Sequence, residues 1–102
     1  MAEFSNSGTL STTGTVLATG TRTVTGVLDK VLSLRFNNPL AYSIQLYKFD
    51  FETSATTLLY NLSLSAGDTV TDNLAYALNT GDQLIAYSNI AGTTYYTYGI
   101  IY

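Results

Sequence analysis

The chain has 102 residues, of which only 11% are charged, and its four basic and seven acidic residues give a net charge of −3. It contains no His and no Cys, which excludes zinc sites of the usual kind, cysteine nucleophiles, serine–histidine triads and disulfides. The four basic residues do not cluster in the sequence, so we expect no nucleic-acid partner.

The first predicted element is a long extended segment with glycine at every sixth position. Nineteen residues at ~3.3 Å each would span about 60 Å, whereas a compact chain of ~100 residues has a radius of gyration of ~13 Å. We therefore expect residues 1–19 to form an extended N-terminal arm that contacts a partner subunit. Folding back into the domain, adding to a neighbour's sheet edge and winding into a stalk are the three alternatives. The glycines are Gly8, Gly14, Gly20 and Gly26, and the last two mark the expected hinge.

The remainder, residues 20–102, is predicted to be one β domain. Thr and Tyr, which favour pleated surfaces, are abundant, and there is one Pro. Turn signals recur every 8–12 residues, which is typical of a sandwich or barrel. We predict a single antiparallel β-sandwich, of jelly-roll or Ig-like type. Alternation of apolar and polar residues places its strands at 32–36, 42–47, 58–64, 74–78, 84–87 and 93–102.

Two turns carry a Gly-Asp pair, at Gly67-Asp68 and at Gly81-Asp82. One interpretation is a calcium site formed by these two carboxylates and Asp72. Calcium requires six to eight oxygen ligands, and the sequence offers no spaced acidic cluster. We favour a structural role, in which Gly supplies a positive φ and Asp accepts N–H groups of the turn.

Asp50 and Glu52 are the pair of carboxylates that invites a glycosidase interpretation. Their position favours the end of a strand in solvent instead. We therefore expect no catalytic residue, no metal and no cofactor.

Tyrosines crowd the last predicted strand, at Tyr95, Tyr96, Tyr98 and Tyr102. Exposed rings of this kind can stack on sugars, but we favour the interpretation in which they fill the sheet and subunit contacts. No charge occurs from Ser88 to the end of the printed sequence, so a free edge here would be prone to association. We expect it to be covered by the N-terminal segment or by a neighbouring subunit.

The second half of the chain carries a resemblance to a known class of protein. An Ala-Gly-Asp turn follows the strand from Leu59, and a Leu-Asn-x-Gly-Asp-x-Leu turn follows Tyr76. With the run from Thr23 to Asn38 and the strand from Tyr42 to Tyr47, this resembles small β-sandwich proteins of tailed-phage virions, over about residues 23–102. The resemblance implies a structural part without catalytic residues, in the capsid, the head–tail junction or the tail.

We therefore expect a non-enzymatic virion structural protein, foremost a capsid decoration protein that assembles by strand addition and surface complementarity. A head–tail junction or tail fibre component and a carbohydrate-binding module are the alternatives. Expected partners are copies of itself, for which we consider a trimer, and virion proteins such as the major capsid protein. No membrane span and no secretory signal are visible, so we expect synthesis in the host cytoplasm. The expected partner-binding residues are Leu10, Val16, Val24, Tyr95, Tyr96, Tyr98 and Tyr102.

Overall fold

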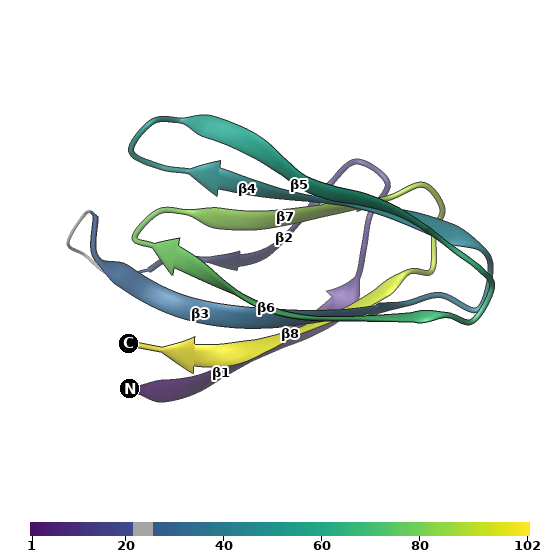
Figure 1. Ribbon diagram of the computed structural model, residues 1–102, viewed down its shortest axis with the longest axis horizontal. Helices are drawn as coiled ribbons and strands as arrows, with labels where there is room; N and C mark the ends of the chain where they lie inside the picture. The colour runs from purple at the N-terminus through teal and green to yellow at the C-terminus, as the bar shows by residue number, and fades with distance from the viewer. Residues whose placement is uncertain (22–25) are drawn as a thin grey trace.

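The computed structural model describes residues 1–21 and 26–102, which form two four-stranded antiparallel sheets stacked face to face (Figure 1). The prediction of an all-β sandwich is confirmed. No helix in the described residues is long and apolar enough to cross a membrane. Sheet A has the order β1 (Ala2–Thr9), β8 (Thr94–Ile101), β3 (Leu28–Asn37) and β6 (Thr69–Asn79), and sheet B has the order β2 (Thr15–Thr19), β7 (Gln83–Ser88), β4 (Tyr42–Asp50) and β5 (Ala55–Leu64).

The strand pairing follows a single rule along the chain. β1 pairs with β8, β2 with β7, β3 with β6 and β4 with β5, all antiparallel. The first half of the chain therefore runs back along the second half as one long hairpin. The pairings of β3 with β8 and of β4 with β7 complete the two sheets. The two termini lie side by side at one end (Figure 1), where Ala2 is opposite Ile101.

The core lies between the central strands of the two sheets. Alternation directs every second side chain of a strand to the same face, and the inward set of β3 and β4 is apolar. Leu32, Leu34 and Phe36 of β3 face Ile44 and Leu46 of β4, and each is at most 1% exposed. Burial of one such side chain stabilises the fold by roughly 1.5–3 kcal/mol. Leu10, Leu17, Leu78 and Leu84 complete the buried leucines.

The extended arm that we expected over residues 1–19 is not confirmed as a separate unit. The chain turns after Leu10, so that β1 joins sheet A and β2 joins sheet B. Gly14 makes this turn possible, because its φ is +112° and a Cβ there would lie 2.8 Å from the Tyr87 ring. Of the three alternatives, the structure shows the first, in which the segment folds back into the domain. The expected hinge lies partly outside the described residues.

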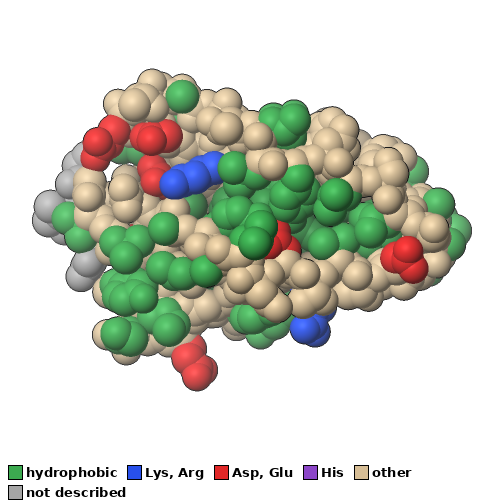
Figure 2. Space-filling model, viewed as in Figure 1, with side chains coloured by type: hydrophobic (Ala, Val, Ile, Leu, Met, Phe, Trp, Pro, Cys, Tyr) green, Lys and Arg blue, Asp and Glu red, His purple; other side chains and the backbone are tan. Residues whose placement is uncertain are grey.

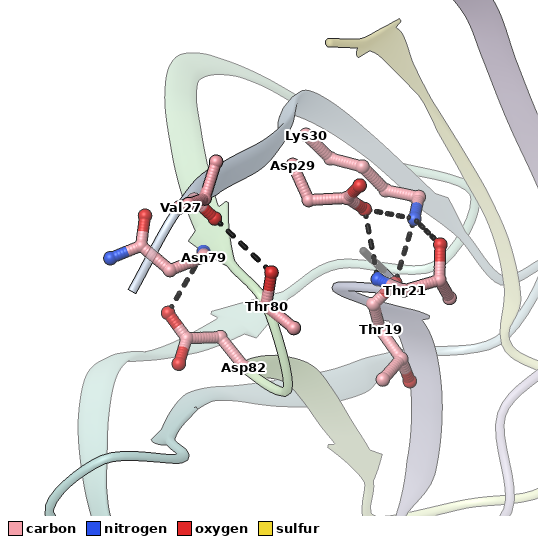
Figure 3. A network of polar contacts seen from close by, with 8 residues as sticks. All are labelled: Thr19, Thr21, Val27, Asp29, Lys30, Asn79, Thr80 and Asp82. Atoms are coloured by element: carbon pink, nitrogen blue, oxygen red, sulfur yellow. Dashed lines mark hydrogen bonds and ion pairs between the residues drawn. The ribbon is translucent and has the colours of Figure 1, made fainter. Parts of the chain in front are cut away.

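A polar network holds the end of β2 against the start of β3 (Figure 3). The register of β3 shifts between Leu28 and Lys30, so the adjacent residues Asp29 and Lys30 are both buried. Lys30 Nζ lies 2.6 Å from Asp29 Oδ2 and donates to the Thr19 carbonyl at 2.7 Å. Asp29 Oδ2 also accepts the Thr21 N–H at 3.0 Å. Buried charges are tolerated when they are paired and hydrogen-bonded in this way.

Candidate binding surfaces

The sandwich is open along the side formed by the edge strands β5 and β6. Hydrophobic side chains gather on the surface between these two strands in Figure 2. They surround a groove of about 430 Å³, which we call the β5–β6 groove. It is lined by Tyr60, Leu62, Val70, Thr71, Asp72, Asn73 and Leu74.

The apolar lining of the groove consists mainly of inward-facing residues, which no further strand covers in the part of the chain that the structure describes. Leu62 of β5 is opposite the buried Ile44, and Val70 of β6 is opposite the buried Phe36. Both therefore point toward the interior, yet the Leu62 side chain remains 38% exposed. This part of the core is accessible from outside.

A carboxylate bridges the two sheets across the groove. Asp72 is opposite Leu34, faces inward and is only 7% exposed. Its Oδ2 accepts the Tyr60 hydroxyl of β5 at 2.7 Å and the Tyr76 hydroxyl of β6 at 2.6 Å, and its Oδ1 accepts the Leu74 N–H at 3.1 Å. Burial, followed by the hydrogen bond and the charge of Asp72, raises the pKa of Tyr60 and that of Tyr76 well above the ordinary value of 10.0.

An irregularity in β6 places one leucine outside the sandwich. Leu32 of β3 is opposite Tyr76 and Leu34 is opposite Asp72, so three residues of β6 stand opposite one residue of β3. Ala75 adopts a φ of +61° within this bulge. Leu74, which the sequence pattern placed on one face with Tyr76 and Leu78, is instead 75% exposed at the rim of the groove.

A second candidate surface lies on the outer face of sheet A. Tyr96 and Tyr98 of β8 stack with ring centroids 5.2 Å apart and an interplanar angle of 22°. The Tyr98 hydroxyl donates to Asn73 Oδ1 at 2.9 Å, while Tyr96 is 42% exposed. The pair borders a hollow of about 540 Å³, lined also by Glu3, Phe4, Ser5, Gly99 and Ile100.

The remaining residues that we expected to bind a partner are scattered. Leu10 is buried in the core, and Tyr95 packs against the core with its hydroxyl accepting the Asn6 amide at 3.3 Å. Val16 is exposed on β2, where it is opposite Ile85, and Tyr102 is exposed near the termini. Val24 lies outside the described residues. β8 itself is covered on one side by β1, which is the first of the two coverings we expected.

The two Gly-Asp turns have the expected glycine conformation. The φ values are +81° at Gly67 and +86° at Gly81. Asp82 accepts the N–H of Asn79 at 3.0 Å and that of Phe51 at 3.0 Å, so its carboxylate stabilises turns as predicted. No group of three or more acidic side chains that could hold a metal ion occurs in the parts of the chain that the structure describes.

The other acidic pair lies at the turn between β4 and β5. Asp50 Oδ1 accepts the backbone N–H groups of Glu52 and Thr53, at 3.0 and 3.3 Å. The carboxylate of Asp50 therefore stabilises this turn by the same chemistry as that of Asp82.

Comparison with known proteins supports the fold of the chain but shows no family. No family model matches the chain, and no curated protein matches it in sequence. Among solved structures, the crystal structure of PirA is similar, with a TM-score of 0.53 and 13% sequence identity over 100% of this chain and 96% of that chain. At this identity the likeness concerns the β-sandwich architecture.

Proposed function

We propose that the protein is a non-enzymatic structural subunit, of the virion decoration type, that attaches to a larger assembly through the β5–β6 groove. The observation that carries this proposal is the exposure of apolar side chains around the groove in a protein with few charges. Leu62 is 38% and Leu74 is 75% exposed. Apolar side chains that are scattered singly over a surface are normal, whereas a contiguous exposed group of them marks an interaction site.

The energetics of such a contact favour attachment in many copies. Burying one leucine contributes roughly 1.5–3 kcal/mol, so two leucines alone give a weak contact once the cost of association is subtracted. Repetition on a symmetric shell multiplies weak contacts into firm attachment. The partner that we propose is the major capsid protein, and the head–tail junction or the tail is the alternative location.

We also infer that the sandwich is a jelly roll rather than an Ig-like fold. The inference is supported by the pairing of the first half of the chain with the second half as one hairpin. It is also supported by eight strands in two four-stranded sheets, because Ig constant-type domains have seven. Jelly rolls occur in viral capsid and lectin domains, so both candidate functions are consistent with the fold.

The test combines stoichiometry with a pair of leucine variants. Particles are purified from a culture that produces this protein, and its copy number per particle is measured. Leu74→Ser is then compared with Leu40→Ser, which changes a leucine that is 63% exposed in the turn between β3 and β4. We expect Leu74→Ser to weaken rebinding to stripped particles about tenfold or more, and Leu40→Ser to rebind normally. Absence of the protein from particles, or equal binding by both variants, contradicts the proposal.

A carbohydrate-binding function is the second candidate, and the stacked pair Tyr96–Tyr98 favours it. Exposed aromatic rings beside hydroxyl, amide and carboxylate groups can hold a sugar ring by stacking and hydrogen bonds. The hollow next to Tyr96 contains such groups on Glu3 and Ser5. On a glycan array, the Tyr96→Ala variant would lose any bound glycan, whereas Tyr102→Ala, a change at a similarly exposed ring, would keep it. An array without any bound glycan removes this candidate.

A further inference from the structure

The four edge strands of the sandwich differ in how they are protected against pairing with another chain. Natural sheets protect their edges with short strands, bulges or inward-pointing charges. β2 has only five residues and an irregular register. β5 has a register shift between Leu58 and Tyr60. β6 carries the three-residue bulge and the inward-pointing Asp72.

β1 has none of these protections. It pairs with β8 at eight consecutive positions, from Ala2 to Thr9, without a register shift. It is the last strand of sheet A, so its other side has no neighbour among the described strands. Its sequence contains no Pro and no Lys, and Glu3 is its one charged residue. A regular, nearly uncharged edge of this length is a template for strand addition.

We propose that β1 pairs with β1 of a second copy of this chain, antiparallel, about a two-fold axis that passes through Asn6. The strand is self-complementary about this residue. The axis would place Ser5 opposite Ser7 on the outer face. On the inner face it would place the Phe4 ring opposite Gly8, which has no side chain of its own to oppose the ring.

The charge of β1 favours this register over others. With the axis at Asn6, Glu3 is opposite Thr9, and the two Glu3 side chains are six positions apart along the pair. At ~3.3 Å per residue this separation is about 20 Å, beyond the Debye length of ~8 Å at physiological ionic strength. An axis near Phe4 would instead bring the two carboxylates together, which destabilises a strand pair.

The resulting dimer would have a continuous eight-stranded sheet made of two copies of sheet A. Pairing of two eight-residue strands supplies about eight backbone hydrogen bonds, within the usual range for a specific interface. An interface of this kind is isologous and closes at two copies, so the dimer replaces the trimer that we considered from the sequence.

The dimer also deepens the proposed function, on which this step rests. β6 lies at the opposite edge of sheet A from β1, so pairing through β1 leaves both β5–β6 grooves accessible. Each dimer would then bind a particle through two grooves, and the second contact would be intramolecular.

The first test uses the absence of cysteine from the chain. Ser5→Cys and Ser7→Cys are oxidised separately and as an equimolar mixture. In the proposed register residue 5 lies opposite residue 7 of the other copy, whereas two residues 5 are diagonal neighbours with Cα atoms about 8 Å apart, too far for a disulfide. We expect a disulfide-linked dimer from the mixture, in up to about half of the protein when subunits mix randomly, and little from either variant alone. Thr71→Cys, on the β6 edge, is the control that should form no disulfide-linked dimer, because pairing through β1 keeps the two residues 71 apart.

A second test uses charge and does not depend on oxidation. Ser5→Lys, Ser7→Lys and Ser7→Glu should each dimerise more weakly than the wild type in sedimentation, because two like charges then lie diagonally across the strand pair, about 8 Å apart. A mixture of Ser5→Lys with Ser7→Glu should recover the dimer, because the two opposite charges then face each other. Recovery also shows that the variants are folded.

Three results would overturn the inference. They are a wild-type protein that stays monomeric up to about 1 mM, cross-linking through Thr71→Cys instead of the Ser5 and Ser7 pair, or no effect of the charges. Failure of the dimer with retained particle binding would refute this inference and leave the proposed function standing. A protein that dimerises through β1 but does not bind particles would refute the proposed function and leave this inference standing.

Discussion

At the scale of single residues, Asp72 is a carboxylate at an apolar opening that is held there by three donors. Removing one donor leaves part of a buried charge without its hydrogen bond, which costs about 1–3 kcal/mol. We therefore expect Tyr60→Phe to lower the free energy of unfolding by this amount in urea denaturation. Tyr47→Phe is the matched control, because its hydroxyl bonds to Gln45 on the outer face of sheet B at 3.3 Å. A control change as large as that of Tyr60→Phe would contradict the role of Asp72.

The same two tyrosines predict a dependence of stability on alkaline pH. Burial and Asp72 raise the pKa of Tyr60 and of Tyr76 in the folded state, while unfolded tyrosine titrates near pH 10. The unfolded state therefore loses protons first as the pH rises. Their contribution to stability is complete below about pH 10 and is lost progressively above it, up to the folded pKa values.

The measurement is the free energy of unfolding from pH 8 to 11.5 for the wild type and for the double variant Tyr60→Phe/Tyr76→Phe. The free energy of unfolding of the variant should be lower at pH 8 and should fall less steeply above pH 10. The difference in slope should correspond to at most about one proton per removed tyrosine. Parallel curves would show that neither hydroxyl is protected from ionisation.

At the scale of elements, alternation of apolar and polar residues was sufficient to locate most of the fold. The patterns at 32–36 and 42–47 lie within β3 and β4, because both strands have one face in the core and the other outside. The pattern at 84–87 lies within β7 for the same reason. The all-β class and the antiparallel pairing could be predicted because such strands are joined by short turns.

The N-terminal segment shows where local patterns stop being informative. Gly14 lies in a turn and Gly8 in a strand, although both occupy the same place in the six-residue spacing. Their difference is set by long-range partners, since Tyr87 lies against Gly14 and Tyr95 against Gly8. A sequence read locally cannot reveal a partner some seventy residues or more away, so the segment resembled one continuous strand.

Bulges explain the other differences between the expected and the observed site. The shift in β3 buries Asp29 beside Lys30, and the bulge in β6 turns Leu74 outward. Neither is visible in a pattern of period two. The inward position of Asp72 was accessible to sequence reasoning, because Val70 has the same parity and faces the core.

Gly20 gives a prediction at this scale, because it lies where the end of β2 meets the turn between β6 and β7. Its N–H donates to the Asp82 carbonyl at 2.9 Å, and its carbonyl accepts the Gly81 N–H at 3.0 Å. A Cβ at Gly20 would overlap the Asn79 carbonyl oxygen. We expect Gly20→Ala to cost about 3 kcal/mol or more in thermal or urea unfolding, since rigid backbone must move.

Gly67→Ala is the matched control for this substitution. Gly67 has a φ of +81° but nothing within 4 Å of an added Cβ, so alanine there meets only backbone strain, about 1–2 kcal/mol. Equal costs for the two variants would mean that the contact of β2 with the turn is looser than the structure indicates.

At the scale of the whole molecule, the hairpin-like pairing sets the order in which contacts can form. β4 and β5 are joined by a short turn, whereas β2 and β7 are separated by more than sixty residues. The entropy lost on closing a loop grows with its length, and topologies rich in distant pairs fold slowly. We therefore expect folding to begin around the β4–β5 hairpin and to proceed outward, with β2 and β1 joining last.

Leu46→Ala and Leu17→Ala test this order with the same change at two places. Leu46 lies in β4 and Leu17 in β2, and both side chains are buried, so each variant should lose about 2–5 kcal/mol of stability. The loss at Leu46 should appear mainly as slower folding, and the loss at Leu17 mainly as faster unfolding, in stopped-flow chevron measurements. The opposite assignment would mean that the paired termini, rather than the central hairpin, organise the transition state. The chain would then have to close its longest loops before its shortest, which the entropy of loop closure disfavours.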